Sequence, residues 1–259
     1  MHALIVVAHP EPQSFNAALS HAAADAWRAA GHTATVVDLY SDGFDPCEAP
    51  RHYADRLDTA RFDAQREQRH HWERGTLAPE VGHHVGLLQQ ADALILQFPL
   101  WWFGAPAILK GWMDRVFVYG GLYSSRRRHD SGVLHGRRAL LSVTTGSSAA
   151  ACAPDGREGD TRLLLWPLMH ALRYVGFDVL EPHLIHAVRS DPAGDNARLD
   201  NARLDDARLV QALADYRARL RAWHTWPRVP FNRDTDFEAG VRLKPDAPAY
   251  GPFIRHAGT

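Results

Sequence analysis

The stretch QFPLWWFGAPAILKGWMDR, residues 97–115, says more about the fold than any other part of the chain. It overlaps the end of a short apolar run, residues 93–98, that is typical of a buried strand. Pro99 ends this strand, and the aromatic residues 101–103 then fall on a loop that lacks the periodicity of a core-facing element. Pro106 stands where a helix begins, because a missing N–H costs nothing at the first helical position. These elements predict a flat apolar platform for a planar heterocycle; the alternative is a loop that packs its tryptophans into a neighbouring domain or subunit.

The composition favours one large α/β domain, alone or with an extension, because 46% of the 259 residues are hydrophobic. The net charge of −1 excludes the strongly basic surface of a nucleic-acid-binding protein. No apolar run approaches the ~20 residues that cross a bilayer, and no signal-peptide pattern precedes the first strand. Two cysteines, Cys47 and Cys152, favour a reducing compartment over a disulfide framework. We therefore expect a cytoplasmic protein without membrane insertion and without a nucleic-acid partner.

Apolar strands and amphipathic helices alternate along the chain. We expect strands at residues 2–9, 33–39, 93–98, 138–144 and 179–186, and helices at residues 17–30, 79–90, 106–118, 161–175 and 210–223. Residues 40–78 look irregular, with Pro, Asp and Arg throughout. The alternation predicts a parallel sheet with helices on both faces. Ligands bind such sheets at the carboxyl ends of the strands, so the candidate site lies in the loops after His9, Phe98 and Thr144.

The other two loops at this edge carry groups that suit a nucleotide. The first, residues 9–16, lacks the glycine patterns of dinucleotide folds and P-loops. It places Ser14, Asn16 and free N–H groups at a helix start, where a phosphate binds well; an ordinary N-cap is the alternative. The loop TTGSS at residues 144–148 has small side chains that let a ligand approach the backbone. One phosphate-type, one aromatic and one small loop together predict a flavin nucleotide.

Two further features carry less information. Sixteen histidines invite a metal hypothesis, but the adjacent pairs at 70–71 and 83–84 lack the spacing of a zinc site, so we expect no metal. A five-residue repeat, DNARL-DNARL-DDARL, covers residues 195–209. Its period does not match the helical 3.6 and is too short for a solenoid. We interpret it as the lengthened start of a surface helix; a partner-binding helix is the alternative.

Several segments closely resemble the NAD(P)H:quinone oxidoreductases of the DT-diaphorase type. They are HPEPQSFNAAL at residues 9–19, QFPLWWFGAPAILKGW at 97–112, TTG at 144–146, LWP at 165–167, VLEPHL at 179–184 and DFEAG at 236–240. The aromatic segment is highly specific, whereas TTG alone would be a weak match. The resemblance covers nearly the whole chain.

The resemblance implies a flavodoxin-like α/β fold, a doubly wound five-stranded parallel sheet of order 2-1-3-4-5. It divides the chain into a catalytic domain, residues 1–224, and a C-terminal extension, residues 225–259, that packs near the interface of a homodimer. It implies FAD rather than FMN, NAD(P)H as co-substrate, and two-electron reduction of a quinone by ping-pong hydride transfer through flavin N5. Trp101, Trp112 and Phe117, which we expect to be exposed beside the site, agree with a dimer.

The resemblance also implies roles for individual positions. The expected flavin contacts are His9, Ser14, Phe15, Asn16, Leu100, Trp101, Trp102, Phe103, Thr144, Thr145, Gly146 and Ser147. The substrate pocket is expected to include Tyr123, Ser125 and Trp102. Asp63 falls where the family has a Gln that contacts the adenosine across the dimer.

Departures from the family pattern concern the flavin edge and the substrate pocket. Cys152 and Glu158 stand where mammalian members have a Tyr and a His that stabilise the charge developing on the flavin during hydride transfer. A carboxylate there would repel that charge, and the neighbouring Arg157 is the candidate to balance it; the alternative is that this loop has shifted along the sequence. Ser125 replaces a second Tyr. The arginines at 126–128 form a solvated loop surface or, alternatively, meet the 2′-phosphate of NADPH.

These departures leave two other functions open. The same fold and flavin would serve an enzyme that reduces an azo compound, a nitro compound or a biosynthetic intermediate. A flavin-binding regulatory subunit of a transporter is the alternative from another class, although the long tail after Trp226 resembles the enzymes.

Overall fold

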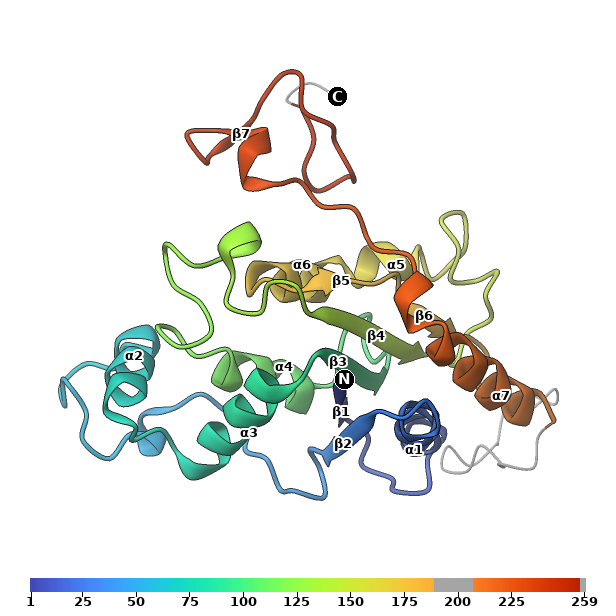
Figure 1. Cartoon of the computed structure of the whole chain (residues 1–259), viewed down its shortest axis with the longest axis horizontal. Coiled ribbons are helices and arrows are strands. Elements are labelled where there is room, and N and C mark those ends of the chain that lie inside the picture. Colours follow the sequence, from blue (N-terminus) through green and yellow to red (C-terminus); the bar gives the residue numbers. More distant parts are fainter. Residues whose placement is uncertain (189–206, 257–259) are drawn as a thin grey trace.

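The computed structural model describes residues 1–188 and 207–256, and its centre is a parallel sheet of order β2-β1-β3-β4-β5 (Figure 1). The strands are β1 (His2–Val7), β2 (Thr33–Asp38), β3 (Ala93–Pro99), β4 (Arg138–Thr144) and the short β5 (Asp178–Val179) and β6 (His183–Ile185), which both pair with β4. All these pairings are parallel. The doubly wound α/β fold with strand order 2-1-3-4-5 is therefore confirmed.

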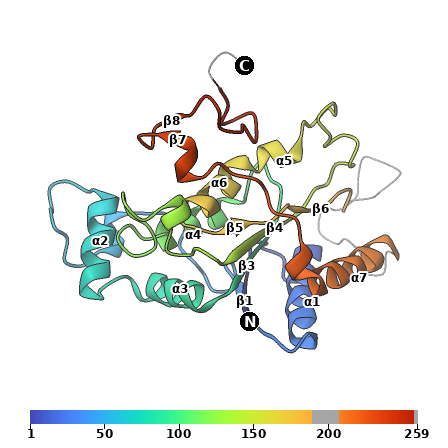
Figure 2. The same ribbon diagram turned by 45° about the horizontal axis from the view of Figure 1, so that its top comes forward.

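Helices cover both faces of the sheet (Figure 2). On one face lie α1 (Phe15–Ala29) and α7 (Ala207–Arg221). On the other face lie α3 (Pro79–Gln90), α4 (Ala107–Val116) and α6 (Trp166–Tyr174). Successive strand side chains alternate between the two faces: Ile5 joins the α1 side and Leu4 the α4 side. Because both faces are covered, the strands read as continuous apolar runs.

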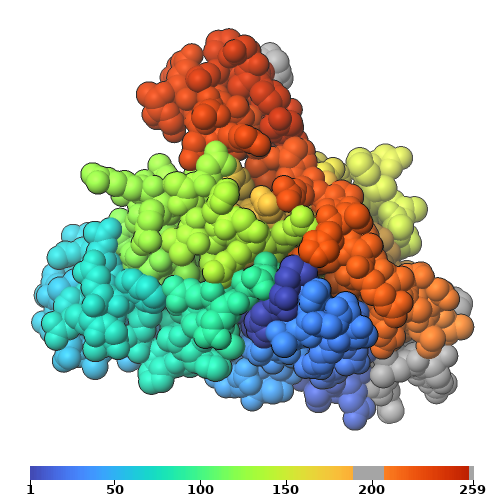
Figure 3. All heavy atoms as spheres, in the orientation of Figure 1, coloured from blue at the N-terminus to red at the C-terminus, as the bar shows by residue number. Residues whose placement is uncertain are grey.

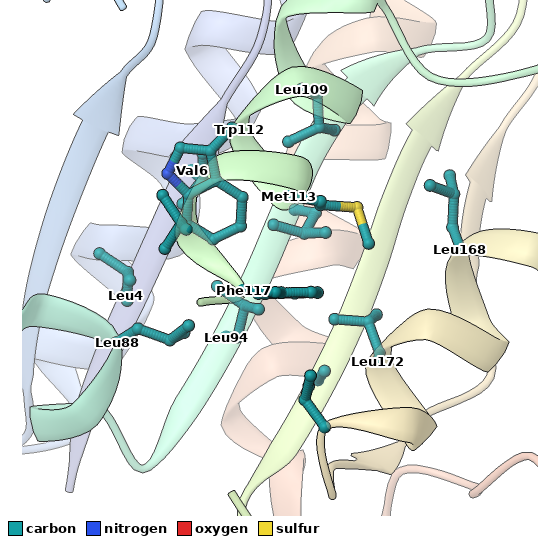
Figure 4. Close-up of a cluster of buried hydrophobic side chains, with 14 of the residues drawn as sticks. Leu4, Val6, Leu88, Leu94, Leu109, Trp112, Met113, Phe117, Leu168 and Leu172 are labelled. Atoms are coloured by element: carbon teal, nitrogen blue, oxygen red, sulfur yellow. The ribbon is translucent and has the colours of Figure 1, made fainter. Parts of the chain in front are cut away.

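The core between α4 and the sheet is built around Trp112, which is fully buried (Figure 4). Its Nε1–H donates to Nδ1 of His84 at 3.2 Å, and burial lowers the pKa of that histidine, which favours the neutral ring. Phe117 packs beside Trp112 with ring centroids 5.9 Å apart. The expectation that both aromatics are exposed beside the site was wrong, because α4 turns Trp112 towards the sheet and Phe117, its C-cap, packs beside it; Trp101 is half-buried.

The region 40–78, which we expected to be irregular, contains the short 3-10 helix Pro50–His52 and α2 (Ala64–Arg74). The side chain of Asp63 accepts the N–H of Arg66 at 3.1 Å as an N-cap, and Gly75 ends the helix at φ 66°. The buried side chains of α2 are polar, so the helix has no apolar periodicity to reveal it. Its caps were the available signal.

Prolines divide two other expected elements. Residues 161–175 form two helices, α5 (Thr161–Leu164) and α6, because Pro167 lies in the first turn of the second and cannot continue the first. Residues 179–186 form two strands, β5 and β6, since Pro182 has no N–H for the ladder.

The expected helix at 210–223 begins earlier, at Ala207, and ends at Arg221. Residues 195–206 of the DNARL repeat lie outside the described residues.

The C-terminal segment projects from the body of the molecule (Figure 3). After the 3-10 turns Trp223–Thr225 and Asp234–Asp236, it forms a small antiparallel hairpin of β7 (Phe237–Glu238) and β8 (Arg242–Leu243). Phe253 of this segment stacks on Trp166 of α6 with centroids 5.1 Å apart. The backbone N–H of Asp234 donates to Asp130 at 2.7 Å, in the 3-10 turn His129–Ser131.

No helix within residues 1–188 and 207–256 is long and apolar enough to cross a membrane. Both cysteines are free; Cys47 is exposed and Cys152 is buried.

His183 predicts that the stability of the fold depends on pH. Its ring stacks on Tyr216 with centroids 4.5 Å apart, and burial lowers its pKa to about 4, with Arg219 adding to the shift and Asp215 opposing it. An unfolded histidine titrates near ~6.5, so between these values the unfolded chain binds a proton that the folded chain does not. Stability present above pH ~6.5 is lost as the pH falls towards 4, on the order of 2–3 kcal/mol for this group.

Urea unfolding at pH 7 and at a pH near 4.5 measures this effect. The matched variant His183→Phe keeps the stacked ring but cannot titrate, so its free energy of unfolding should fall less between the two pH values. Equal losses in the wild type and the variant would contradict the assignment to His183.

Candidate active site

Residues 101–104 form a tight turn directly after β3. The N–H of Trp101 donates to the carbonyl of Gly104, and the N–H of Gly104 donates back to Trp101, both at 3.0 Å. The two central residues, Trp102 (φ 50°) and Phe103 (φ 61°), both have left-handed backbone, as in a type I′ turn. This conformation costs a non-glycine residue ~1–2 kcal/mol. Since small residues normally fill such positions, two aromatics here indicate that the side chains serve a function.

The aromatic side chains of this turn face solvent. Trp102 is 96% exposed, the highest value among the large hydrophobic side chains of the described residues. Phe103 is 51% exposed. The ring of Trp101, at the base of the turn, lies 5.8 Å from the ring of His9. The turn therefore combines backbone strain with an apolar surface that only a ligand or another chain would cover.

A buried network of side chains joins the three loops at this edge of the sheet. Asn16 of α1 donates to the hydroxyl of Thr144 at 3.0 Å and accepts from Gln97 at 2.8 Å. The N–H of Leu100 donates to the carbonyl of Thr144 at 2.8 Å. Asn16, Gln97 and Thr144 are each at least 96% buried. Leaving a buried partner unsatisfied costs about 1–3 kcal/mol, so the network holds the loops in one relative position.

An open pocket of about 250 Å³ lies between the aromatic turn and the loop after β4. Its lining consists of Leu100, Trp102, Phe103, Thr145, Gly146, Ser147, Cys152, Glu158, Thr161 and Leu164. Eight of these ten were predicted site residues. Thr161 and Leu164 were not, although the sequence places them in the helix that follows the loop. Glu158 is the one charged side chain in this set, and Arg157 is exposed and is not part of it.

Backbone N–H groups around the pocket are free to bind a ligand. Those of Trp102, Phe103, Gly146 and Ser147 have no acceptor among the described residues. A ring system with carbonyl and nitrogen acceptors at its edge would satisfy these donors while its face covers the apolar side chains.

The first loop presents the start of α1. Ser14 is its N-cap, accepting the N–H of Ala17 at 3.2 Å, as the N-cap interpretation predicted. The N–H groups of Phe15 and Asn16 have no acceptor within the described part of the chain, so they and the helix dipole favour an anion. His9 accepts the N–H of Glu11 at 3.1 Å. The side chain of Phe15 is buried in the core, so its backbone rather than its ring is available to a ligand.

Comparison with known proteins assigns the family. A family model for the flavodoxin-like fold matches residues 1–209. The chain is 36% identical over 250 residues to NAD(P)H dehydrogenase (quinone) 1 of Rattus norvegicus. The aligned region covers 93% of this chain and 86% of the rat protein. The chain belongs to the flavodoxin-like quinone dehydrogenase family.

Other relatives agree with this assignment. Ribosyldihydronicotinamide dehydrogenase (quinone) of Pongo abelii is 42% identical over 186 residues, covering 71% of this chain and 80% of that protein. A solved Klebsiella pneumoniae structure has a TM-score of 0.79 and 31% identity, covering 95% of this chain and 92% of that one. The quinone dehydrogenase family binds a flavin, and the geometry of the turn, the pocket and the start of α1 is compatible with one.

Of the three predicted substrate residues, Trp102 lines the pocket of this single chain, whereas Tyr123 and Ser125 lie outside it. Tyr123 is half-buried, its hydroxyl accepts from Gln65 at 3.3 Å, and burial raises its pKa. Ser125 is exposed. Two of the three arginines of this loop are engaged within the chain: Arg127 donates to the carbonyl of Gly120 at 2.8 Å, and Arg128 donates to the hydroxyl of Tyr174 at 3.3 Å.

Arg126 differs from its two neighbours. Its guanidinium has no hydrogen bond or ion pair among the described residues, and its side chain is exposed. It is therefore the arginine of this loop with the most freedom to meet an anionic ligand.

Asp63, the expected adenosine contact, serves as the N-cap of α2. Within residues 1–188 and 207–256, no three His, Cys, Asp or Glu side chains group closely enough to hold a metal ion.

The strain in the turn predicts an unusual effect of glycine. Because Trp102 is almost fully exposed, replacing it removes little packing, and glycine also removes the left-handed strain. We expect Trp102→Gly to exceed Trp102→Ala in free energy of unfolding by about 1 kcal/mol in the flavin-free protein. The control pair is Trp101→Gly and Trp101→Ala, where φ is not positive and glycine should be the less stable by ~0.5–1 kcal/mol. Urea titrations measure both differences; the same sign at both positions would contradict the argument.

Proposed function

We propose that this chain is an FAD-dependent reductase that transfers two electrons from NAD(P)H to a quinone. The observation that carries the proposal is the strained turn, whose exposed Trp102 and Phe103 flank a pocket ringed by free backbone N–H groups. The family relationship supplies the reaction class. When bound, a flavin supplies hydride chemistry at its N5, which serves NAD(P)H and the quinone in alternation.

Each loop would hold a different part of the flavin nucleotide. Trp102 and Phe103 would cover the ring, and their N–H groups with those of Gly146 and Ser147 would satisfy its polar edge. The N–H groups at the start of α1 would bind the diphosphate. We infer FAD rather than FMN because the first loop follows the pattern of the DT-diaphorase type of enzyme.

The pocket lining must also accommodate negative charge. Glu158 lies in the pocket with Cys152, whose Sγ is 3.9 Å from the hydroxyl of Thr145. A thiol is a weak donor, and a carboxylate disfavours an anionic ligand. The exposed Arg157 lies outside the lining, so we propose only that Cys152 and Glu158 border the flavin; Arg157 remains a prediction.

We further propose that the active unit is a homodimer. Two of the three expected substrate residues, Tyr123 and Ser125, do not line the pocket of their own chain. A second copy would cover the exposed aromatic turn. The extension begins packed against the catalytic domain, where Trp226 and Val229 are buried. Its β7–β8 hairpin projects from that domain (Figure 1) and would pack near the dimer interface. Sedimentation of the flavin-loaded protein tests this: a fully active species of 28.9 kDa, the mass of one chain, would exclude the dimer.

A purified sample tests the proposed function directly. The protein should carry a flavin that, once released, is identified as FAD, and it should oxidise NADPH when menadione is added. A protein that binds flavin but turns over neither quinones nor azo or nitro compounds would instead be a regulatory subunit.

Loss of the stacked face at Trp102 should weaken flavin binding. We expect Trp102→Ala to raise the Kd for FAD about fivefold to tenfold, corresponding to the ~1 kcal/mol that an aromatic contact adds beyond its area. Trp102→Phe keeps an aromatic face and should lie close to the wild type. Fluorescence titration of the flavin-free protein gives each Kd, and an unchanged Kd in the alanine variant would remove Trp102 from the flavin site.

Arg126 is the residue that we expect to affect the KM for NADPH. If Arg126 meets the 2′-phosphate of NADPH, Arg126→Ala should raise the KM for NADPH about fivefold, the worth of ~1 kcal/mol for an exposed charge pair. The KM for NADH should stay the same. Arg127→Ala is the matched control, because Arg127 is already bound to Gly120. Equal effects on both nucleotides would assign Arg126 to the solvated surface.

A further inference from the structure

The pocket lacks a positive partner for an anionic ligand. Among its ten lining residues, Glu158 carries the one formal charge, and that charge is negative. Arg157 is exposed and lies outside the lining. The free backbone N–H groups of the lining can donate to a ligand that gains negative charge, but a positive charge has to come from the residues behind the lining.

His186, directly after β6, lies in that second layer. Its Nδ1 is 3.0 Å from the hydroxyl oxygen of Thr145, which lines the pocket, and the same hydroxyl lies 2.9 Å from the carbonyl of Ser147. A threonine hydroxyl has one proton. When it donates to Ser147, the Nδ1 of His186 must carry a proton and donate to Thr145.

The backbone holds this contact in place. The N–H of Thr145 donates to the carbonyl of Ile185 at 2.9 Å, the N–H of Val188 donates to the carbonyl of Thr145 at 3.1 Å, and the N–H of Ala187 donates to the carbonyl of Ser147 at 2.9 Å. Ala187 adopts left-handed backbone, with φ 54°, to make this bond. Such strain in a non-glycine residue persists where the surroundings impose it, and here it fixes the segment beside His186 against the pocket loop.

We propose that His186 is a positioning residue of the active site: acting through the Thr145 hydroxyl, it provides a hydrogen-bond donor and, when protonated, a positive charge to an anionic group in the pocket. The inference rests on the proposed function, because a bound flavin that has accepted electrons is what brings that charge.

The hydroxyl of Thr145 can turn between two acceptors while His186 keeps its contact. A ring with N–H at Nδ1, whether neutral or protonated, donates to Thr145 and cannot accept from it. The Thr145 proton then points either to Ser147 or to a ligand. The Ser147 carbonyl keeps its bond from Ala187 when Thr145 turns away, so turning leaves no buried acceptor unsatisfied.

Protonation of His186 should follow the charge in the pocket. Burial lowers the pKa of His186, which favours a neutral ring while the pocket holds no negative ligand charge. Among the charged side chains near this segment, Glu158 of the pocket lining favours protonation of His186. Arg208 of α7, which donates to the carbonyl of Ala187 at 3.3 Å, opposes it. Added negative charge on a ligand raises the pKa of a nearby histidine, so the imidazole of His186 gains a proton when the ligand becomes negatively charged.

The first test observes the imidazole directly, by nitrogen-15 NMR of histidine-labelled protein. In the flavin-free wild type, Nδ1 of His186 should carry the proton, and Thr145→Val should shift the tautomer towards Nε2–H. After loading with FAD and reduction with dithionite, the pKa of His186 should rise, whereas that of the half-buried His170 on α6 should not. An unchanged tautomer in Thr145→Val, or a His186 that does not respond to reduction, overturns the proposal.

The second test separates the donor from the charge by activity. His186→Asn keeps a neutral donor near the Nδ1 position, and His186→Leu keeps neither. With NADPH and menadione, wild-type turnover should exceed that of His186→Asn about fivefold near pH ~6 and converge with it at high pH. His186→Leu should be slower at every pH, and Thr145→Val should abolish the difference between the wild type and His186→Asn. His170→Gln is the control and should keep the wild-type pH profile.

The outcomes distinguish the two proposals. If the protein binds no FAD and reduces no menadione, the proposed function fails, and this inference fails with it. If FAD binds and turnover is normal but the pH profiles of the wild type and His186→Asn coincide, the function stands and His186 has only a structural role.

Discussion

The buried contact of Asn16 with Gln97 and Thr144 is the constraint on which the candidate site depends. These three residues come from the first turn of α1 and from the ends of β3 and β4, which are far apart in the sequence. Each is buried in a place where an unsatisfied amide or hydroxyl would be costly. The network therefore fixes the distance between the anion-binding start of α1, the aromatic turn and the small-residue loop. This arrangement preorganises the three loops for a ligand as long as a dinucleotide.

On this rigid base the protein places groups that are unfavourable in the absence of a ligand. Trp102 and Phe103 combine left-handed backbone with exposed apolar rings, and four backbone donors around the pocket have no acceptor within the described chain. A planar ligand with polar edges would cover the apolar rings and satisfy the donors. The left-handed backbone of the turn stays as it is when a ligand binds, so the strain serves to preorganise the site.

The electrostatics of the pocket depend on residues behind its surface. Glu158 is negative and belongs to the lining, while the arginines nearby in the sequence are directed elsewhere or exposed. Positive charge can therefore reach the pocket through Thr145, which contacts His186. A histidine one hydrogen bond away costs less than a cation in the lining, because it can stay neutral until negative charge arrives.

The sequence by itself determined the parallel sheet and the three loops of the site, because apolar runs and their helical partners are local patterns. The strand order followed from the family resemblance. It failed where the decisive contacts are not local. The polar helix α2 has no apolar periodicity that would reveal it. Trp112 and Phe117 were expected at the surface, and only the packing of α4 against the sheet shows that both are buried. Likewise, only the tertiary structure could bring His186 to Thr145, since that contact joins residues 41 positions apart through strand pairing. Local periodicity specifies elements, whereas the pairing of β4 with β6 decides which side chains meet.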